Sequence, residues 1–153
     1  EVKPGDLGQV LYLHGVLYAE EYGFGLYFEG YVAQSIAEYV LMQDHEGSAL
    51  WVAEDEGKII GSIAILKHSP QEAQLRWFLL CPEYRGRGLG QKLFDISVEF
   101  CREQGFRKIF LWTFDKLHAA CHIYETAGFK QTDSKIHSLW GQKVTEVRYD
   151  LEL

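Results

Sequence analysis

The chain has 153 residues, of which 47% are hydrophobic and 24% charged, which suits one compact globular domain over residues 1–153. The net charge of −7 argues against a nucleic-acid-binding surface, because such a surface needs a basic face. The three cysteines are widely spaced and form no CxxC pair, so we expect a cytoplasmic protein without a disulfide framework or metal site. We also expect no membrane span and no signal peptide, because the sequence has no apolar run of about 18 residues and no leader-like start.

The first part of the chain is expected to be helical. Apolar residues at helical spacing predict two helices, Val10–Tyr22 and Phe28–Met42, with a glycine-aromatic loop between them. We expect the second helix to bury a side formed by Tyr31, Ile36, Tyr39 and Val40.

Three strands are predicted next, in meander order. They cover Ala49–Glu54, Lys58–Lys67 and Glu72–Cys81, and Asp55-Glu56-Gly57 forms the hairpin turn between the first two. Beyond Pro82 the period changes to that of a helix that ends at Gly105. Its expected buried face is formed by Leu89, Leu93, Ile96 and Phe100.

The last part alternates short strands with one helix. We predict a strand at Lys108–Thr113, a helix at Leu117–Ala127 and a strand pair at Phe129–Asp133 and Lys143–Leu151, joined by the loop Ser134–Gln142. The complete order, ααβββαβαββ, predicts an α/β fold with a mixed, mostly antiparallel sheet flanked by helices.

A glycine-rich turn, Arg85-Gly86-Arg87-Gly88-Leu89-Gly90, lies between the third strand and the helix after it. Such a turn leaves backbone N–H groups uncovered at a helix N-terminus, where the helix dipole favours a pyrophosphate, and two arginines add charge. A tight connection that needs glycine for positive φ is the plainer alternative. The dinucleotide fingerprint G-x-G-x-x-G does not fit, because its third glycine would fall at Gln91 or Leu93, and the Walker loop does not fit, because Gln91-Lys92 replaces its Lys-Ser/Thr pair.

The turn fits the R/Q-x-x-G-x-G/A pattern, and Ala119-Ala120-Cys121-His122-Ile123-Tyr124-Glu125-Thr126-Ala127-Gly128-Phe129 follows about 34 residues later as a second signature. Together these motifs resemble the GNAT (Gcn5-related) N-acetyltransferases over roughly residues 72–133. The resemblance implies the GNAT fold and transfer of an acetyl group from acetyl-CoA to a primary amine of a small molecule or protein, without a metal. The alternative is a non-catalytic acyl-CoA or amine sensor.

The resemblance also implies roles for particular residues. The cofactor would be bound by Phe78, Leu79 and Leu80 of the third strand and by the turn residues Arg85, Gly86, Arg87, Gly88, Leu89, Gly90 and Gln91. Tyr124 would be catalytic, protonating the departing CoA thiolate, although a half-buried helical aromatic is the plainer interpretation. Leu117 stands where the family often has an asparagine that contacts CoA, and the strand Phe110–Thr113 lacks the glutamate base of some members.

The acceptor side is less defined by motifs. We expect the substrate-binding residues Tyr22, Glu29, Arg76 and Trp140 to face one cavity beside the acetyl end of CoA. Arg76, two residues before Phe78 and expected on the same strand face, could bind a substrate carboxylate or pair with Glu29. The general base is open among Glu21, Glu29, His14 and His137, each of which is equally a plain surface charge or a hydrogen-bonded histidine.

Two further expectations come from the flanking segments. Pro4–Gly8 and Trp140-Gly141 resemble acetyltransferase domains fused to MarR-type regulators, so an attached MarR-type DNA-binding domain and a homodimer are both left open. Glu1-Val2-Lys3 resembles the end of the family's first strand, so we expect the native chain to extend N-terminally. We expect this domain itself to contact neither nucleic acid nor a membrane.

Overall fold

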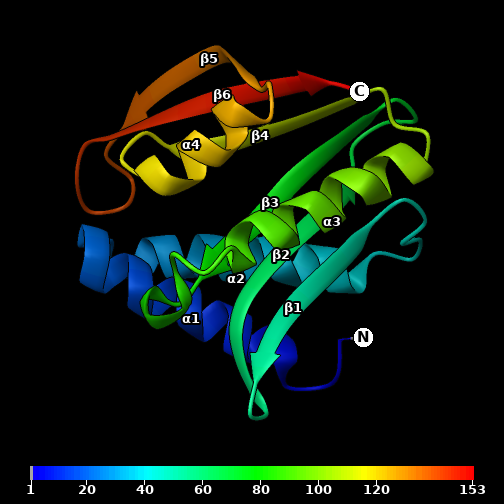
Figure 1. Ribbon diagram of the computed structural model, residues 1–153. Coiled ribbons are helices and arrows are strands. Elements are labelled where there is room, and N and C mark those ends of the chain that lie inside the picture. The colour runs from blue at the N-terminus through cyan, green and yellow to red at the C-terminus, as the bar shows by residue number, and fades with distance from the viewer. Residues whose placement is uncertain (1) are drawn as a thin grey trace.

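The computed structural model describes residues 2–153 as a six-stranded sheet with helices α1 and α2 on one face and α3 and α4 on the other (Figure 1). The predicted element order and α/β class are confirmed. Val2 and Lys3 precede α1 outside any strand, and Glu1 lies outside the described residues. The elements are α1 (Asp6–Tyr22), α2 (Leu26–Leu41), β1 (Ala49–Asp55), β2 (Lys58–Lys67), β3 (Glu72–Leu80), a 3-10 turn (Pro82–Tyr84), α3 (Leu89–Glu103), β4 (Lys108–Phe114), α4 (His118–Thr126), β5 (Lys130–His137) and β6 (Val144–Glu152).

The sheet is mixed and contains one incomplete strand pair. Its order is β1-β2-β3-β4-β6-β5, and every neighbouring pair is antiparallel except β3 and β4, which are parallel. These two strands pair only from Glu72–Lys108 to Gln74–Phe110 and then diverge, as Figure 1 shows. The backbone of β3 beyond Gln74 therefore has no β4 partner, and the candidate site lies in this gap.

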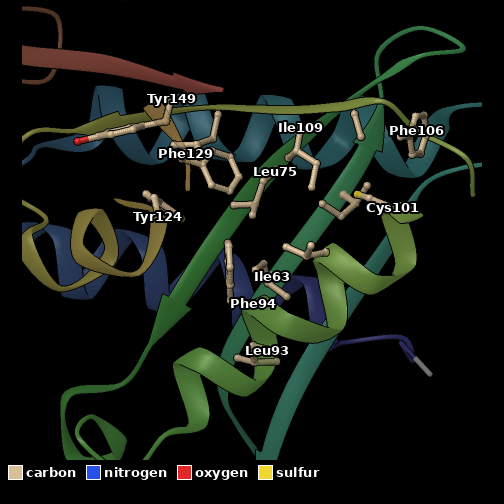
Figure 2. Packing of buried hydrophobic residues seen from close by; sticks show 14 of the residues in the cluster. Ile63, Leu75, Leu93, Phe94, Cys101, Phe106, Ile109, Tyr124, Phe129 and Tyr149 are labelled. Atoms are coloured by element: carbon tan, nitrogen blue, oxygen red, sulfur yellow. The ribbon is translucent and has the colours of Figure 1, made fainter. Parts of the chain in front are cut away.

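A hydrophobic core on each face holds the helices against the sheet. On the α3/α4 face Ile63, Leu75 and Ile109 pack with Phe94 and Tyr124 (Figure 2). The core on the α1/α2 face consists of Val10, Phe24, Phe28, Val32, Ile36, Ile59, Ala64, Trp77, Phe114, Trp140 and Val144. Because successive strand residues point to opposite faces, one strand such as β2 supplies both cores.

A β-bulge at Trp77 interrupts this alternation in β3. Trp77 has a φ of 48°, and the register with β2 shifts between Ser62 and Ala64. As a result Arg76 lies against Tyr31 of α2 and Trp77 donates from Nε1 to Ser35 of α2 (3.2 Å), while Phe78 lies near Phe94 on the opposite face. The expectation that Arg76 and Phe78 share a strand face is therefore wrong, because the bulge inserts one residue between them.

Three local predictions are also corrected. Tyr31, Val40 and Ile96 are 45%, 43% and 40% exposed, so the expected buried faces of α2 and α3 are rotated from the real ones. Both helices carry apolar residues on more than one stripe, and packing on the sheet selects the stripe that is buried. The predicted loop Ser134–Gln142 is shorter, since β5 pairs with β6 as far as His137. The residues that do face the sheet are Phe28, Val32, Ser35 and Ile36 in α2 and Leu93, Phe94, Ser97, Val98 and Cys101 in α3.

Candidate active site

The glycine-rich turn enters α3 through two left-handed residues. Gly86 and Gly88 have φ values of 77° and 80°, and Gly88 is the N-cap of α3 with no side-chain cap hydrogen bond. Other residues rarely adopt these angles. The first N–H groups of a helix have no partner within the helix, so the turn presents uncovered donors at the positive end of the α3 dipole.

A cleft of about 310 Å³ opens in front of this turn. Eight of the ten predicted cofactor residues line it, and the other two, Arg87 and Leu89, do not. The guanidinium of Arg87 lies instead 5.5 Å from the centre of the Tyr84 ring. We call this space the cleft, and its lining residues are Tyr18, Glu21, Tyr22, Phe78, Leu79, Leu80, Arg85, Gly86, Gly88, Gly90, Gln91, Leu117, His118, Ala119, Ala120 and Ile123.

An ion pair spans the edge of the cleft. Arg85 donates from Nη1 and Nη2 to the two carboxylate oxygens of Glu21, at 2.5 and 3.1 Å, and from Nε to the carbonyl oxygen of Leu80 at 2.9 Å. These contacts tie α1 to the turn. They also occupy Glu21, one of the four residues predicted as candidate bases.

A second cavity, of about 150 Å³, lies between the diverging strands and the helices α1 and α2. It shares Tyr18, Phe78, Leu117 and Ala120 with the cleft, so the two spaces meet at these side chains. Its walls are rich in rings, and we call it the aromatic cavity. The rings come from Tyr18, Phe28, Tyr31, Trp77, Phe78, Trp112, Phe114, Tyr124 and Trp140, and the polar side chains from His14, Gln74, Arg76, Thr113, Lys135 and Glu146.

Tyr124 lies on α4 at the inner end of the aromatic cavity. It is 3% exposed, and its ring packs among Phe78, Phe94 and Phe129, with the last two shown beside it in Figure 2. Burial raises the pKa of the Tyr124 phenol well above its usual range, since a phenolate is poorly solvated there. The hydroxyl therefore stays protonated at neutral pH and is a potential proton donor.

His14 is the one predicted base that lines the aromatic cavity. Its Nδ1 lies 2.8 Å from the carbonyl oxygen of Val10. A carbonyl only accepts, so Nδ1 carries the proton and Nε2 keeps a lone pair. Burial lowers the pKa of His14 to about 4, which makes it neutral at pH 7 but a weak base.

Glu146 is a buried carboxylate in the same cavity that the sequence reasoning missed. Its Oε1 lies 2.8 Å from Nε2 of His137 and 3.8 Å from Nζ of Lys135. The sequence signal was present, because Glu146 lies in the strand segment Val144–Val147 in phase with Val144, which is fully buried. His137 itself does not line the cavity; it contacts Glu146 and the ring of Trp140.

The four predicted acceptor residues do not share one cavity. Arg76 and Trp140 line the aromatic cavity, whereas Tyr22 lines the cleft. Glu29 lines neither, because its carboxylate packs against Gly15 of α1, where an added Cβ would lie 2.1 Å from Oε1. Both N-terminal helices line the aromatic cavity, with His14 and Tyr18 from α1 and Phe28 and Tyr31 from α2.

Residues 2–153 contain neither a metal-binding cluster nor a membrane-spanning helix. No group of three or more His, Cys, Asp or Glu side chains within this part of the chain is placed to hold a metal ion. None of its helices combines the length and the apolar composition that a membrane span requires.

Known proteins resemble this chain in sequence and in structure. Residues 9–129 match the acetyltransferase (GNAT) family. Human N-acetyltransferase 8B is 32% identical over 103 residues, which are 64% of this chain and 45% of that protein, so the chain spans about half the length of this curated relative. A crystal structure of an acetyltransferase from Streptococcus agalactiae 2603 is 26% identical, covers 100% of this chain and 94% of its own, and has a TM-score of 0.73. A GNAT acetyltransferase from Elizabethkingia anophelis with acetyl-CoA bound shares the fold, with 15% sequence identity and a TM-score of 0.63. The match covers 78% of this chain and 82% of that chain.

Proposed function

The chain belongs to the acetyltransferase (GNAT) family, and we propose that it transfers the acetyl group of acetyl-CoA to a primary amine by direct attack in a ternary complex. One observation carries the proposal. The cleft that begins at the glycine turn meets the aromatic cavity at Phe78 and Leu117, with Tyr124 beside that junction. A carrier bound in the cleft and an amine bound in the cavity are thereby brought together, which removes most of the entropy cost of their encounter.

The cleft fits the chemistry of acetyl-CoA. The uncovered N–H groups around Gly86–Gln91 suit its pyrophosphate, and a Cβ at the left-handed Gly88 would force another backbone angle. The edge of β3 that faces away from β2 has no β4 partner beyond Gln74, which suits the amides of the pantetheine arm. Acetyl-CoA bound to the same fold in the Elizabethkingia protein supports this assignment.

The residues at the junction suit the proton transfers of the reaction. The amine nitrogen forms a bond to the acetyl carbon as the carbon–sulfur bond breaks. Tyr124 donates its proton to the leaving sulfur, and backbone N–H groups of β3 stabilise the charge that develops on the carbonyl oxygen. We assign acceptance of the amine proton to Glu146, because its carboxylate lines the aromatic cavity, whereas Glu21 and Glu29 do not line it and His14 is a weak base.

A sensor that binds acetyl-CoA without turnover is the second candidate. Leu117 favours it, because this apolar side chain lines both the cleft and the cavity where the family often has an asparagine. A homodimer, an attached MarR-type domain and a cytoplasmic location remain predictions that accompany either function.

The experiment combines binding and turnover. Acetyl-CoA should raise the melting temperature by linkage, and an amine panel should release the CoA thiol. Glu146→Gln should lower this release at unchanged acetyl-CoA binding, with Glu99→Gln on the exposed side of α3 as the control. Tight acetyl-CoA binding without acetylation of any amine would favour the sensor, and no binding would refute both functions.

A further inference from the structure

Arg76 is a cation in the wall of the aromatic cavity. It is half-buried in the middle of β3, and its guanidinium carbon lies 5.8 Å from the ring centre of Tyr31 and 5.5 Å from that of Trp77. Its Nη2 donates to the Tyr31 hydroxyl at 3.2 Å. A guanidinium has five N–H donors, so most of them remain for another partner.

The charge of Arg76 is not neutralised by any acidic side chain in the described part of the protein. Among residues 2–153 it takes part in no ion pair, whereas the half-buried Arg148 is bonded to Asp150. The chain has 22 acidic residues and 15 lysines and arginines, so a lack of carboxylates does not explain this. Glu29, the partner considered from the sequence, packs against α1 instead.

The bulge places Trp77 beside Arg76 on the cavity side of β3. Arg76 faces α2 by regular alternation, because Leu75 before it packs in the core on the opposite face. The left-handed Trp77 then turns to the same side as Arg76 instead of the opposite one. A left-handed non-glycine residue is strained and persists where its surroundings hold it. Here Ser62 donates to the Trp77 carbonyl oxygen at 2.7 Å, and Trp77 donates to Ser35.

An opposite charge lies elsewhere in the same cavity. Glu146 comes from β6, beyond the gap between β3 and β4, and His137 and Lys135 contact it through Oε1. Aromatic side chains make up much of the wall. The cavity therefore offers a guanidinium for an anion, a carboxylate for an amine and rings for an apolar group.

We propose that the acceptor is an amine that also carries a carboxylate, which Arg76 binds, as an amino acid does. The proposal rests on the acetyl transfer proposed above and names its substrate class. A guanidinium binds a carboxylate in a bidentate geometry. A phosphate suits the site less, because its two charges would face one arginine near Glu146 in a protein of net charge −7.

Matched acceptors isolate the contribution of the carboxylate. The assay compares four acceptors: leucine, phenylalanine, tryptophan and 4-aminobutyrate. Each is tested as the free acid, the amide and the amine without the carboxyl group. Ethanolamine phosphate is tested as a further acceptor that carries a phosphate in place of the carboxylate. Thiol release at saturating acetyl-CoA gives kcat/KM for each compound. We expect at least one free acid to exceed its amide by about 10- to 100-fold, the usual range for hydrogen bonds to a charged group.

Arg76→Gln tests whether Arg76 causes the preference for free acids over amides. It should remove most of the acid preference, mainly through KM, while the amides change less than about threefold. Arg76→Lys should restore part of it, because charge returns without the bidentate geometry. Arg107→Gln is the matched control, since this exposed arginine lies outside both the cleft and the cavity. An acid preference that survives Arg76→Gln, equal rates for acids and amides, or a preference for ethanolamine phosphate would each overturn the proposal.

Binding separates this proposal from the acetyl transfer on which it rests. With CoA present, the N-acetylated acids should raise the melting temperature of the wild type more than the N-acetylated amides do, and Arg76→Gln should abolish the difference. This binding preference without turnover would support carboxylate recognition and reject acetyl transfer. Turnover without any preference in rates or melting would retain acetyl transfer and reject carboxylate recognition.

Discussion

The cleft and the aromatic cavity are adjacent, but they are built in different ways. The cleft includes exposed backbone, at the left-handed glycines before α3 and along the edge of β3 that has no β4 partner, beside side chains of α1 and α4. The cavity is formed by side chains from α1, α2, β3, β4, α4, β5 and β6 and from the β5–β6 loop. A surface of backbone donors suits a ligand that does not change, whereas a surface of side chains can be altered without loss of the fold.

The cleft and the aromatic cavity also differ in how their charged side chains are paired. In the cleft Arg85 is neutralised by Glu21, so uncovered amides are the principal free donors. In the cavity Arg76 has no acidic partner among residues 2–153, and Glu146 is buried beside His137. Changes in the cleft should therefore affect binding of acetyl-CoA, and changes in the cavity should affect the choice of acceptor.

The largest expected effect is in the cleft. Gly88→Val should lower the affinity for acetyl-CoA by more than 100-fold and abolish its melting-temperature shift, because a β-branched residue cannot keep the φ of 80° that exposes the amides. Gly57→Val is the matched control, since Gly57 has a φ of 77° in the β1–β2 turn, outside the cleft. Both variants should lose stability, but Gly57→Val should keep the ligand shift. A normal shift in Gly88→Val would refute the phosphate-binding role.

The next effect is at the junction of the two spaces. Tyr124→Phe should lower kcat by about 100-fold, the usual scale of general acid catalysis, with little change in acetyl-CoA binding, because only the hydroxyl is removed. The raised pKa of Tyr124 predicts that deprotonation of this phenol does not reduce activity up to pH 9. Steady-state kinetics across this pH range measures both.

The control for this variant is Tyr149→Phe. Tyr149 is buried, and its ring centre lies 6.0 Å from that of Tyr124. Its hydroxyl donates to Glu125, and it lines neither the cleft nor the aromatic cavity. Its kcat should stay within about threefold of the wild type. Equal kcat values for Tyr124→Phe and the wild type would remove Tyr124 from the mechanism.

A smaller effect concerns stability in acid. Since burial lowers the pKa of His14 to about 4, the unfolded chain binds a proton between pH 6.5 and 4 that the folded chain does not. Stability therefore falls as the pH drops through this range. His14→Asn keeps a donor for the Val10 carbonyl and cannot titrate, so from pH 8 to pH 5 it should lose about 2 kcal/mol less unfolding free energy than the wild type.

Urea unfolding at the two pH values measures this difference. His122→Asn is the control, because His122 is exposed on α4, and it should follow the wild type. The same acid sensitivity in His14→Asn and the wild type would show that His14 does not stay neutral in the folded cavity.

Local sequence was informative where a local rule determines the structure. The glycine turn, the helix after it and the Asp55–Gly57 hairpin turn were predicted within a few residues, because positive φ and helix initiation depend on adjacent residues. The placement of Tyr22, Glu29 and Glu146 was not predicted, because it depends on how α1, α2 and β6 pack together. Arg76 shows both cases, since its unusual position was visible in the sequence, whereas its place beside Trp77 and on the face opposite to Phe78 depends on the Trp77 bulge.

The sequence by itself therefore determined the element order, the family and a glycine-rich turn at the start of α3, all of which follow from residue spacing over short distances. Only the tertiary structure decided that β3 and β4 separate after Gln74, that Glu21 pairs with Arg85 and that Arg76 and Glu146 share a cavity. These features join segments at least 36 residues apart in the chain, the separation of Gln74 and Phe110. Such contacts depend on packing and on the bulge, which hydrophobic periodicity does not encode.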